Sequence, residues 1–180
     1  MSERSDFRQP PQRDEYFEYY AKYVDRVPEG DIRVLLDEQV RTLRELFDGV
    51  SETTASIVHP PSTWTLKQVV GHLIDAERIF AERLHHFAMG DLQPLPGMNQ
   101  EEYVAHADYE TPSLATLVDE LVLLRQANAL LLRRLKPTDL AARGEASGHP
   151  VTVRALAWML VGHIEHHLTI VRRRLAEKGD

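Results

Sequence analysis

The chain has 180 residues, of which 43% are hydrophobic and 27% are charged, and its net charge is −7. These values are typical of a globular protein with one core. The negative charge argues against a nucleic-acid-binding protein, which usually has a basic excess. Because the chain contains no cysteine, disulfide bonds, thiolate metal ligands and a cysteine nucleophile are excluded.

The hydropathy pattern contains no signal for secretion or membrane insertion. The N-terminal stretch "MSERSDFRQPPQRDEY" lacks the apolar segment of a signal peptide. No apolar run approaches the roughly 18 residues that a membrane-spanning helix needs. We therefore expect a cytoplasmic protein that binds neither a membrane nor nucleic acid.

The N-terminal part of the chain is expected to be an appendage to a single domain. We expect residues 1–12 to form a flexible arm and residues 13–180 to form one helical domain. The stretch "DEYFEYYAKYV" at 14–24 predicts a short aromatic helix that docks on this domain. The first long helix is expected to begin after Asp31, because aspartate is a favoured N-cap residue and an apolar face follows it.

Two further long helices have clear boundary signals. The second begins at Thr65, which forms a capping-box pattern with Gln68, and it ends at Gly90. The third opens near Pro112, a residue suited to a first helical turn, and ends at Pro137.

The rest of the chain predicts a short helix, a last long helix and extended loops. "QEEYVAHADY" at 100–109 indicates the short helix, and the last long helix covers Thr152 to about Lys178, with Gly179 as its end. No stretch has a convincing strand pattern, so "PTDLAARGEASGHP" at 137–150 is interpreted as a loop. Four long helices must bury their apolar faces on one another, which predicts an all-α four-helix bundle with long inter-helix loops.

The last helix contains the stretch "LVGHIEHHLTI", in which three histidines fall within five positions. At 100° per residue, His163 and His167 lie about 40° apart, in the middle of the apolar face. Two imidazoles at this spacing are a common helical arrangement for binding a metal. His166 falls at the edge of the face, where a boundary residue or a hydrogen-bond donor to a ligand is favoured over a ligand.

His72 is the best candidate for a third ligand. It lies in the second helix, and the same "VGH" motif precedes an apolar residue there and in the last helix. Since glycine inside a helix costs about 1 kcal/mol relative to alanine, Gly71 and Gly162 are predicted to allow neighbouring backbones to approach. His72 would then meet His163 and His167. The alternative is that these histidines are hydrogen-bonded core residues without a metal.

Other charged residues of the second helix are harder to place. Asp75 lies one turn beyond His72, where it would orient the imidazole or accept a proton, although a surface role fits the pattern as well. Periodicity gives no secure position to Glu77, Arg78 or Arg83. The loops "MGDLQPLPGMNQ" and "ARGEASGHP" are expected to supply the walls of a pocket.

The ordered set of motifs resembles the DinB-like family, which includes YfiT-like proteins and the bacillithiol- and mycothiol-dependent transferases. The motifs are a "YY" segment, "EGD", "WTLKQVVGHLIDAERIF", "GDLQPLPG" and the H-x-x-x-H of the last helix, and the resemblance covers roughly residues 16–178. It implies an up-down-down-up bundle. It also implies one divalent metal held by His72, His163 and His167, with nickel or zinc favoured and iron or manganese as alternatives.

Three functional hypotheses follow. The first is a metal-dependent enzyme that transfers a small thiol to an electrophilic substrate, with a metal-dependent hydrolase as a close variant. Three neutral histidines would leave the metal its charge and an open position, which is typical of a catalytic site. The second hypothesis is a metal-binding, stress-related protein without turnover, and the third is a purely structural bundle. We also expect a small-molecule substrate and a homodimer formed through exposed helix faces.

Overall fold

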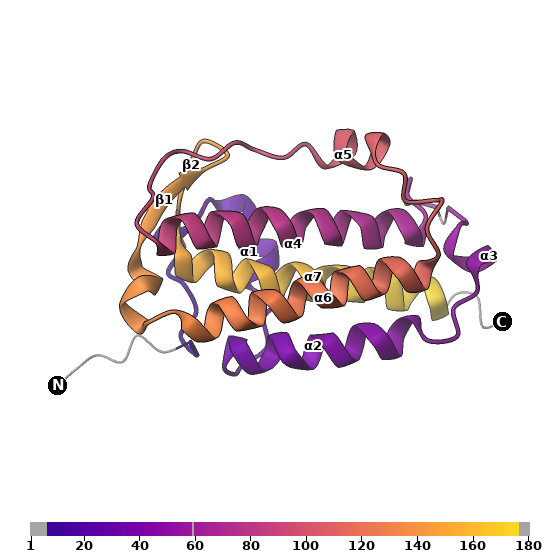
Figure 1. Ribbon diagram of the computed structural model, residues 1–180, viewed down its shortest axis with the longest axis horizontal. Helices are drawn as coiled ribbons and strands as arrows, with labels where there is room; N and C mark the ends of the chain where they lie inside the picture. The colour runs from indigo at the N-terminus through magenta and orange to yellow at the C-terminus, as the bar shows by residue number, and fades with distance from the viewer. Residues whose placement is uncertain (1–6, 59, 177–180) are drawn as a thin grey trace.

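The computed structural model describes residues 7–58 and 60–176, and four long helices dominate it (Figure 1). These are α2 (Ile32–Phe47), α4 (Leu66–Ala88), α6 (Leu114–Arg134) and α7 (Val153–Ala176). Each of α2 and α4 packs against both α6 and α7. Figure 1 shows that α2 and α7 run in one direction and α4 and α6 in the other. The up-down-down-up four-helix bundle is therefore confirmed.

The helix starts follow from local side-chain chemistry. The Asp31 carboxylate accepts a hydrogen bond from the backbone N–H of Arg33, and Thr65 and Gln68 form the expected capping box. The third helix begins two residues after Pro112, because the side chain of Ser113 is the N-cap. The predicted end of the last helix, at 178–179, lies outside the described residues.

The stretch at 137–150 is not a simple loop as predicted. After a 3₁₀ turn at Pro137–Ala141, strands β1 (Arg143–Ala146) and β2 (His149–Thr152) pair antiparallel. The two residues between them, Ser147 and Gly148, have φ of 56° and 77°, which is the conformation of a tight hairpin turn. The strands were missed because each has four residues, and neither the glycine in β1 nor the proline in β2 favours a strand.

The N-terminal segment is more closely attached than a flexible arm. Residues 1–6 lie outside the described residues, but Phe7 is buried in the core and its carbonyl oxygen accepts a 3.0 Å hydrogen bond from the N–H of Ile32. Phe7 and Pro11 are therefore buried within the stretch for which a flexible arm was expected. The aromatic helix expected at 14–24 is broken into 3₁₀ turns at Arg13–Glu15 and Glu18–Tyr20 and helix α1 (Ala21–Val24).

Two short helices complete the described elements. Helix α3 (Glu52–Ala55) lies in the connection between α2 and α4, and α5 (Gln100–His106) lies in the long connection between α4 and α6. This second connection runs back along the bundle before α6 begins (Figure 1). No described helix combines the length and the apolar character that crossing a membrane would require.

A buried polar layer divides the core into two apolar clusters. On α2, Gln39 separates Leu36 of one cluster from Leu43 of the other. The same division occurs in the other helices, between Ile74 and Ala76 of α4 beside the buried Glu77, at Arg125 and Asn128 of α6, and at Gly162 and His163 of α7. Polar groups therefore meet at one level of the bundle.

Arg125 is the centre of this layer and is completely buried. Its guanidinium pairs with the carboxylate of Glu77 and donates to the side-chain oxygen of Gln39 and to the carbonyl oxygen of Leu160, the latter at 3.2 Å. Asn128 donates to the second oxygen of Glu77 at 2.7 Å. One network therefore joins all four long helices.

Replacing Arg125 with methionine should destabilise the protein strongly, because Glu77 would remain buried without its partner. Loss of one partner of a buried ion pair costs about 3–5 kcal/mol, and burial already raises the pKa of Glu77. Urea unfolding should show this loss, and Glu77→Gln in the Arg125→Met background should recover part of it. Arg133→Met, which removes an exposed ion pair from the same helix, is the control. Strictly additive losses in the double variant would contradict the coupling.

Candidate metal centre

Three imidazoles converge at the level of the polar layer. His72 comes from α4, and His163 and His167 come from successive turns of α7. One ring nitrogen of each lies within 4.8 Å of those of the other two, and the Nε2 atoms of His72 and His163 are 3.1 Å apart. The three residues predicted from the sequence therefore meet in space as a group that could hold a metal ion.

The surroundings of the three imidazoles are almost free of solvent. His72, His163 and His167 are 3%, 4% and 8% exposed. The rings of Trp64 and Tyr23 pack against the cluster, with centroids 5.2 Å from His72 and 4.9 Å from His163 respectively. Polar side chains in such surroundings need partners, because an unsatisfied buried polar group is costly.

Burial keeps the three imidazoles neutral. Loss of hydration and, to a lesser extent, the charge that His166 would carry lower the pKa of His72 to about 4. Loss of hydration also lowers the pKa values of His163 and His167, and the neighbouring histidines add to both effects. Neutral imidazole is the form that binds a metal, so the cluster is in its ligating state at neutral pH.

The donor set fits a divalent transition metal. Nitrogen ligands about 2.0–2.1 Å from a tetrahedral zinc ion are separated by about 3.3 Å, which is close to the 3.1 Å between His72 and His163. The fit departs from the usual pattern in one respect, because ligating histidines generally donate their other N–H to a neighbour. Here Nδ1 of His72 and of His167 are buried and have no hydrogen-bond partner among the described residues.

The two glycines beside the histidines do allow close approach, but not between α4 and α7. A Cβ on Gly162 would lie 2.1 Å from the carbonyl oxygen of Tyr23, and a Cβ on Gly71 would lie 2.3 Å from the ring of Tyr109. Gly162 therefore admits the backbone of α1, and Gly71 admits an aromatic side chain. The predicted approach of a neighbouring backbone is therefore found at Gly162, where the neighbour is α1, and it is wrong for Gly71.

A cleft of about 90 Å³ leads to the cluster, and His72 and His163 form part of its wall. Tyr19, Tyr20 and Phe80 contribute aromatic surface to it. Both loops that were expected to form a pocket take part, through Met98 and Gln100 from one loop and Ser147 from the other. The described lining residues include no carboxylate.

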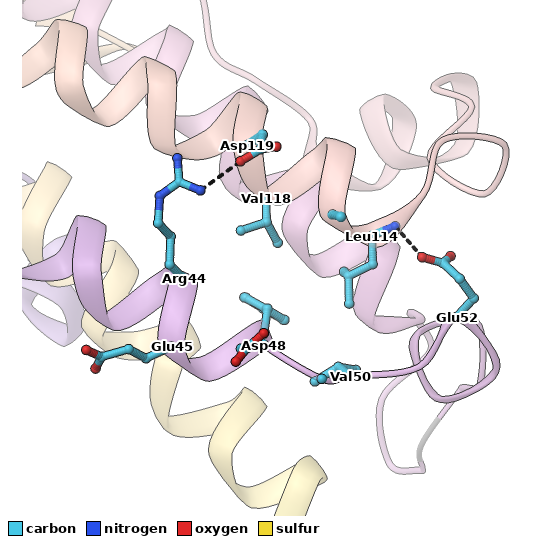
Figure 2. A pocket seen from close by; sticks show the side chains of 11 residues that line it. Arg44, Glu45, Asp48, Val50, Glu52, Leu114, Val118 and Asp119 are labelled. Atoms are coloured by element: carbon cyan, nitrogen blue, oxygen red, sulfur yellow. Dashed lines mark hydrogen bonds and ion pairs between the residues drawn. The ribbon is translucent and has the colours of Figure 1, made fainter.

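A more voluminous groove of about 470 Å³ lies elsewhere, between the end of α2 and the start of α6 (Figure 2). Arg44 and Asp119 form a 2.8 Å ion pair across it, and the Glu52 carboxylate accepts a hydrogen bond from the N–H of Leu114 (Figure 2). No histidine lines this groove. Arg44, Asp119 and Glu52 already have partners, so the histidine cleft is the better candidate for a functional site.

Comparison with known proteins decides the family. A family model described as the DinB superfamily matches residues 35–171, a range that contains all three converging histidines. The chain belongs to the DinB superfamily. Among solved structures it is similar to YfiT from Bacillus subtilis, with 18% identity, coverage of 93% of this chain and 94% of that chain, and a TM-score of 0.72.

The similarity to YfiT shows a shared fold, since the identity is low. That protein is described as a probable metal-dependent hydrolase with an unusual four-helix bundle topology. A comparison with curated proteins finds no match. The DinB superfamily assignment therefore rests on the family model, and the fold rests on the model and the solved structure together.

In this DinB superfamily chain, His166 and Asp75 lie outside the group of three converging histidines. His166 is half-buried, and its ring lies 5.4 Å from that of Tyr23, outside the converging triad. Asp75 accepts a 2.6 Å hydrogen bond from the hydroxyl of Tyr109 and makes none with His72. A direct orienting bond from Asp75 to His72 is therefore absent among the described contacts.

Sequence reasoning missed several residues that shape the site. Tyr23 and Tyr109 lie in short or irregular segments, where no periodicity shows which way a side chain points. Arg125 had a detectable signal, because it continues the apolar face formed by Leu114, Leu121 and Ala129 of α6. A charged residue at such a position indicates a buried polar partner.

His163→Ala and His167→Ala should each abolish tight metal binding by this DinB superfamily protein, whereas His166→Ala should retain it. The reason is that only the first two imidazoles converge with His72. Elemental analysis and calorimetric titration with nickel and zinc would measure stoichiometry and affinity. Equal loss of metal in the His166→Ala variant would show that the ligand assignment is wrong.

The metal-free protein should lose stability as the pH falls below about 6.5. The folded chain holds the pKa of His72 at about 4, whereas an unfolded imidazole titrates near 6.5. Between these values the unfolded state binds more protons, so the free energy of unfolding decreases with decreasing pH. Protonation of His72 alone should lower the free energy of unfolding by about 3 kcal/mol between neutral pH and pH 4.

Urea unfolding of chelator-treated protein between pH 7.5 and 5 would measure this loss. His72→Gln should make the dependence on pH shallower, because glutamine does not titrate. A free energy of unfolding that stays constant over this range in the wild-type chain would contradict the neutral, buried state of the cluster.

Proposed function

We propose that this protein is a metal-dependent enzyme that transfers a small thiol to an electrophilic carbon of a second substrate. The observation that carries the proposal is a triad of buried, neutral imidazoles that opens onto a cleft without a carboxylate among its described lining residues. His72, His163 and His167 would hold the metal. A divalent metal so bound supplies Lewis acidity and lowers the pKa of a thiol or water that coordinates it.

The chain's own residues favour a thiol as the nucleophile. The protein has no cysteine, so the thiol must arrive on a co-substrate. In such a transfer the sulfur forms a bond to carbon, and the leaving group departs with the electron pair of the bond that breaks. The thiol would lose its proton to solvent before the electrophile binds, and the thiolate then needs no general base, which agrees with a cleft that has no carboxylate among its described lining residues.

These lining residues would position the two reactants and keep water away. Tyr20, Tyr23 and Phe80 surround the approach to His163. Holding two reactants in contact in a confined cleft supplies a large part of the rate gain in bimolecular transfers. The narrowness of the cleft therefore favours small substrates.

Hydrolysis is the second candidate, and two observations favour it. The structurally similar YfiT is described as a probable metal-dependent hydrolase. In addition, burial lowers the pKa of His166, and this neutral ring lies 5.1 Å from that of His167. His166 would then accept the proton of the attacking water.

The proposal also covers the identity of the metal, the cellular location and the oligomeric state. We propose nickel or zinc as the native metal, with iron or manganese as alternatives, and a cytoplasmic location. Pairing into a homodimer would use the outer face of α6, where Leu123 and Leu130 are 63% and 60% exposed and lie two turns apart. A metal-binding, stress-related protein without turnover is the outcome if no reaction is found.

Metal-loaded protein should accelerate conjugation of at least one cellular thiol to an aryl or alkyl halide. His72→Ala, His163→Ala and His167→Ala should lose this activity together, because each removes a ligand of the same metal. Absorbance or mass spectrometry would follow the product. Conjugation no faster than with thiol alone would contradict thiol transfer, and release of acid from ester or amide probes would then support hydrolysis.

A further inference from the structure

Arg83 is a buried cation whose charge has no partner among the described residues. It is 4% exposed, and its Nη2 donates to the carbonyl oxygen of Pro96 at 2.7 Å and to the hydroxyl of Ser147 at 3.0 Å. Both acceptors are neutral, and Nη1 and Nε donate to no described atom. Arg125, which is buried to a similar degree, instead pairs with Glu77. Buried charges are normally paired, because desolvation is costly.

Arg83 and the histidine cluster border the same cleft. Arg83 follows His72 by eleven residues on α4. At 100° and 1.5 Å per residue, it lies within about 20° of the same helix face and about 16 Å further along the axis. Helical side chains lean towards the N-terminus, which on α4 is the direction of His72.

The surface between these two ends of the cleft is apolar. Ala76, Ile79 and Phe80 of α4 line it between His72 and Arg83. The cleft therefore presents a metal-binding end, an apolar middle and a cationic end, in that order along one helix face.

The turn that holds Arg83 is conformationally costly. Ser147 has φ of 56°, a conformation that suits glycine or asparagine better than serine. Its hydroxyl is what accepts the hydrogen bond from Nη2. The Ser147 hydroxyl and the Pro96 carbonyl oxygen together orient the guanidinium.

We propose that Arg83 binds the carboxylate of a small substrate whose reacting group lies at the histidine cluster. Arginine recognises carboxylates through charge-assisted hydrogen bonds, and a carboxylate would supply the missing counter-charge. The ligand is an anionic molecule with a short apolar body, and its carboxylate belongs either to the thiol or to the electrophile. The placement of the reacting group rests on the proposed function, whereas recognition of the carboxylate does not.

The first experiment measures carboxylate recognition without metal or thiol. Calorimetry or NMR titration of the metal-free protein would compare hexanoate with the neutral hexanamide. We expect hexanoate to bind at least about tenfold more tightly, Arg83→Met to abolish this preference, and Arg83→Lys to keep part of it. Arg78→Met is the matched control, since Arg78 is on the same helix but pairs with Glu120 at the exposed surface. Equal binding of both probes to the wild-type chain would overturn the proposal, even if the variants fail to fold.

A purely structural role for Arg83 predicts a different result. A guanidinium that only holds Pro96 and Ser147 together would lower the melting temperature when removed. It would give the wild-type protein no preference for the carboxylate probe. Preference in the wild type and its loss in Arg83→Met, with the fold checked by circular dichroism, therefore support recognition over a structural role.

The second experiment separates this inference from the proposed function. Cobalt-loaded protein would be titrated with 6-mercaptohexanoate and 6-mercaptohexanol, and the thiolate-to-cobalt charge-transfer absorption would be followed. Absorption with both thiols and tighter binding of the acid support both proposals. No absorption with either thiol, together with a preference for hexanoate, contradicts thiol binding and leaves Arg83 recognition supported. Absorption with both thiols at equal affinity, together with a preference for hexanoate, assigns the carboxylate to the electrophile.

Discussion

The burial of the Arg125 guanidinium at the middle of the bundle is the constraint on which the rest of the structure depends. A completely buried cation requires a counter-charge and hydrogen-bond acceptors close to it. Glu77 provides the charge, and Gln39 and the carbonyl of Leu160 provide acceptors. Because these partners come from α4, α2 and α7, the network fixes the relative height of all four long helices.

The hydrogen-bond network of Arg125 also fixes the relative positions of the three histidines. The carbonyl oxygens of Leu160 and Val161 accept hydrogen bonds from Arg125 and Gln39 immediately before the Gly162–His163 pair. Glu77 follows His72 by little more than one turn of α4. A slip of either helix along its axis would break the buried ion pair and separate His72 from His163 at the same time. The polar layer therefore both stabilises the bundle and positions the histidines of the candidate metal centre.

The segments outside the four long helices give the cleft its chemical character. Tyr23 of α1 reaches His163 because Gly162 leaves room for its carbonyl oxygen. The connection after α4 joins the hairpin through hydrogen bonds of Leu95 with Glu145 and Ser147. This pairing brings Pro96 and Ser147 to Arg83. Short and irregular segments therefore supply the aromatic wall and the cationic end, while the helices supply the ligands.

The sequence by itself determined the features that depend on neighbours along the chain. The caps at Asp31 and Thr65 follow from side chains that reach their own backbone, and the common face of His163 and His167 follows from the 3.6-residue period. Together with the family resemblance, these local rules were enough for the four helices, the bundle and the three converging histidines.

Only the tertiary structure decided which groups face one another across helices and loops. Periodicity fixes the angle of a residue about its own helix axis, but the partner helix and its height are set by packing. For this reason Asp75 pairs with Tyr109 instead of His72, and Gly71 and Gly162 admit neighbours that no local pattern indicated. The sequence likewise did not show the β1–β2 hairpin, and it did not show that Arg78 is exposed and Arg83 buried. Strand pairing and burial depend on contacts between residues far apart in the chain.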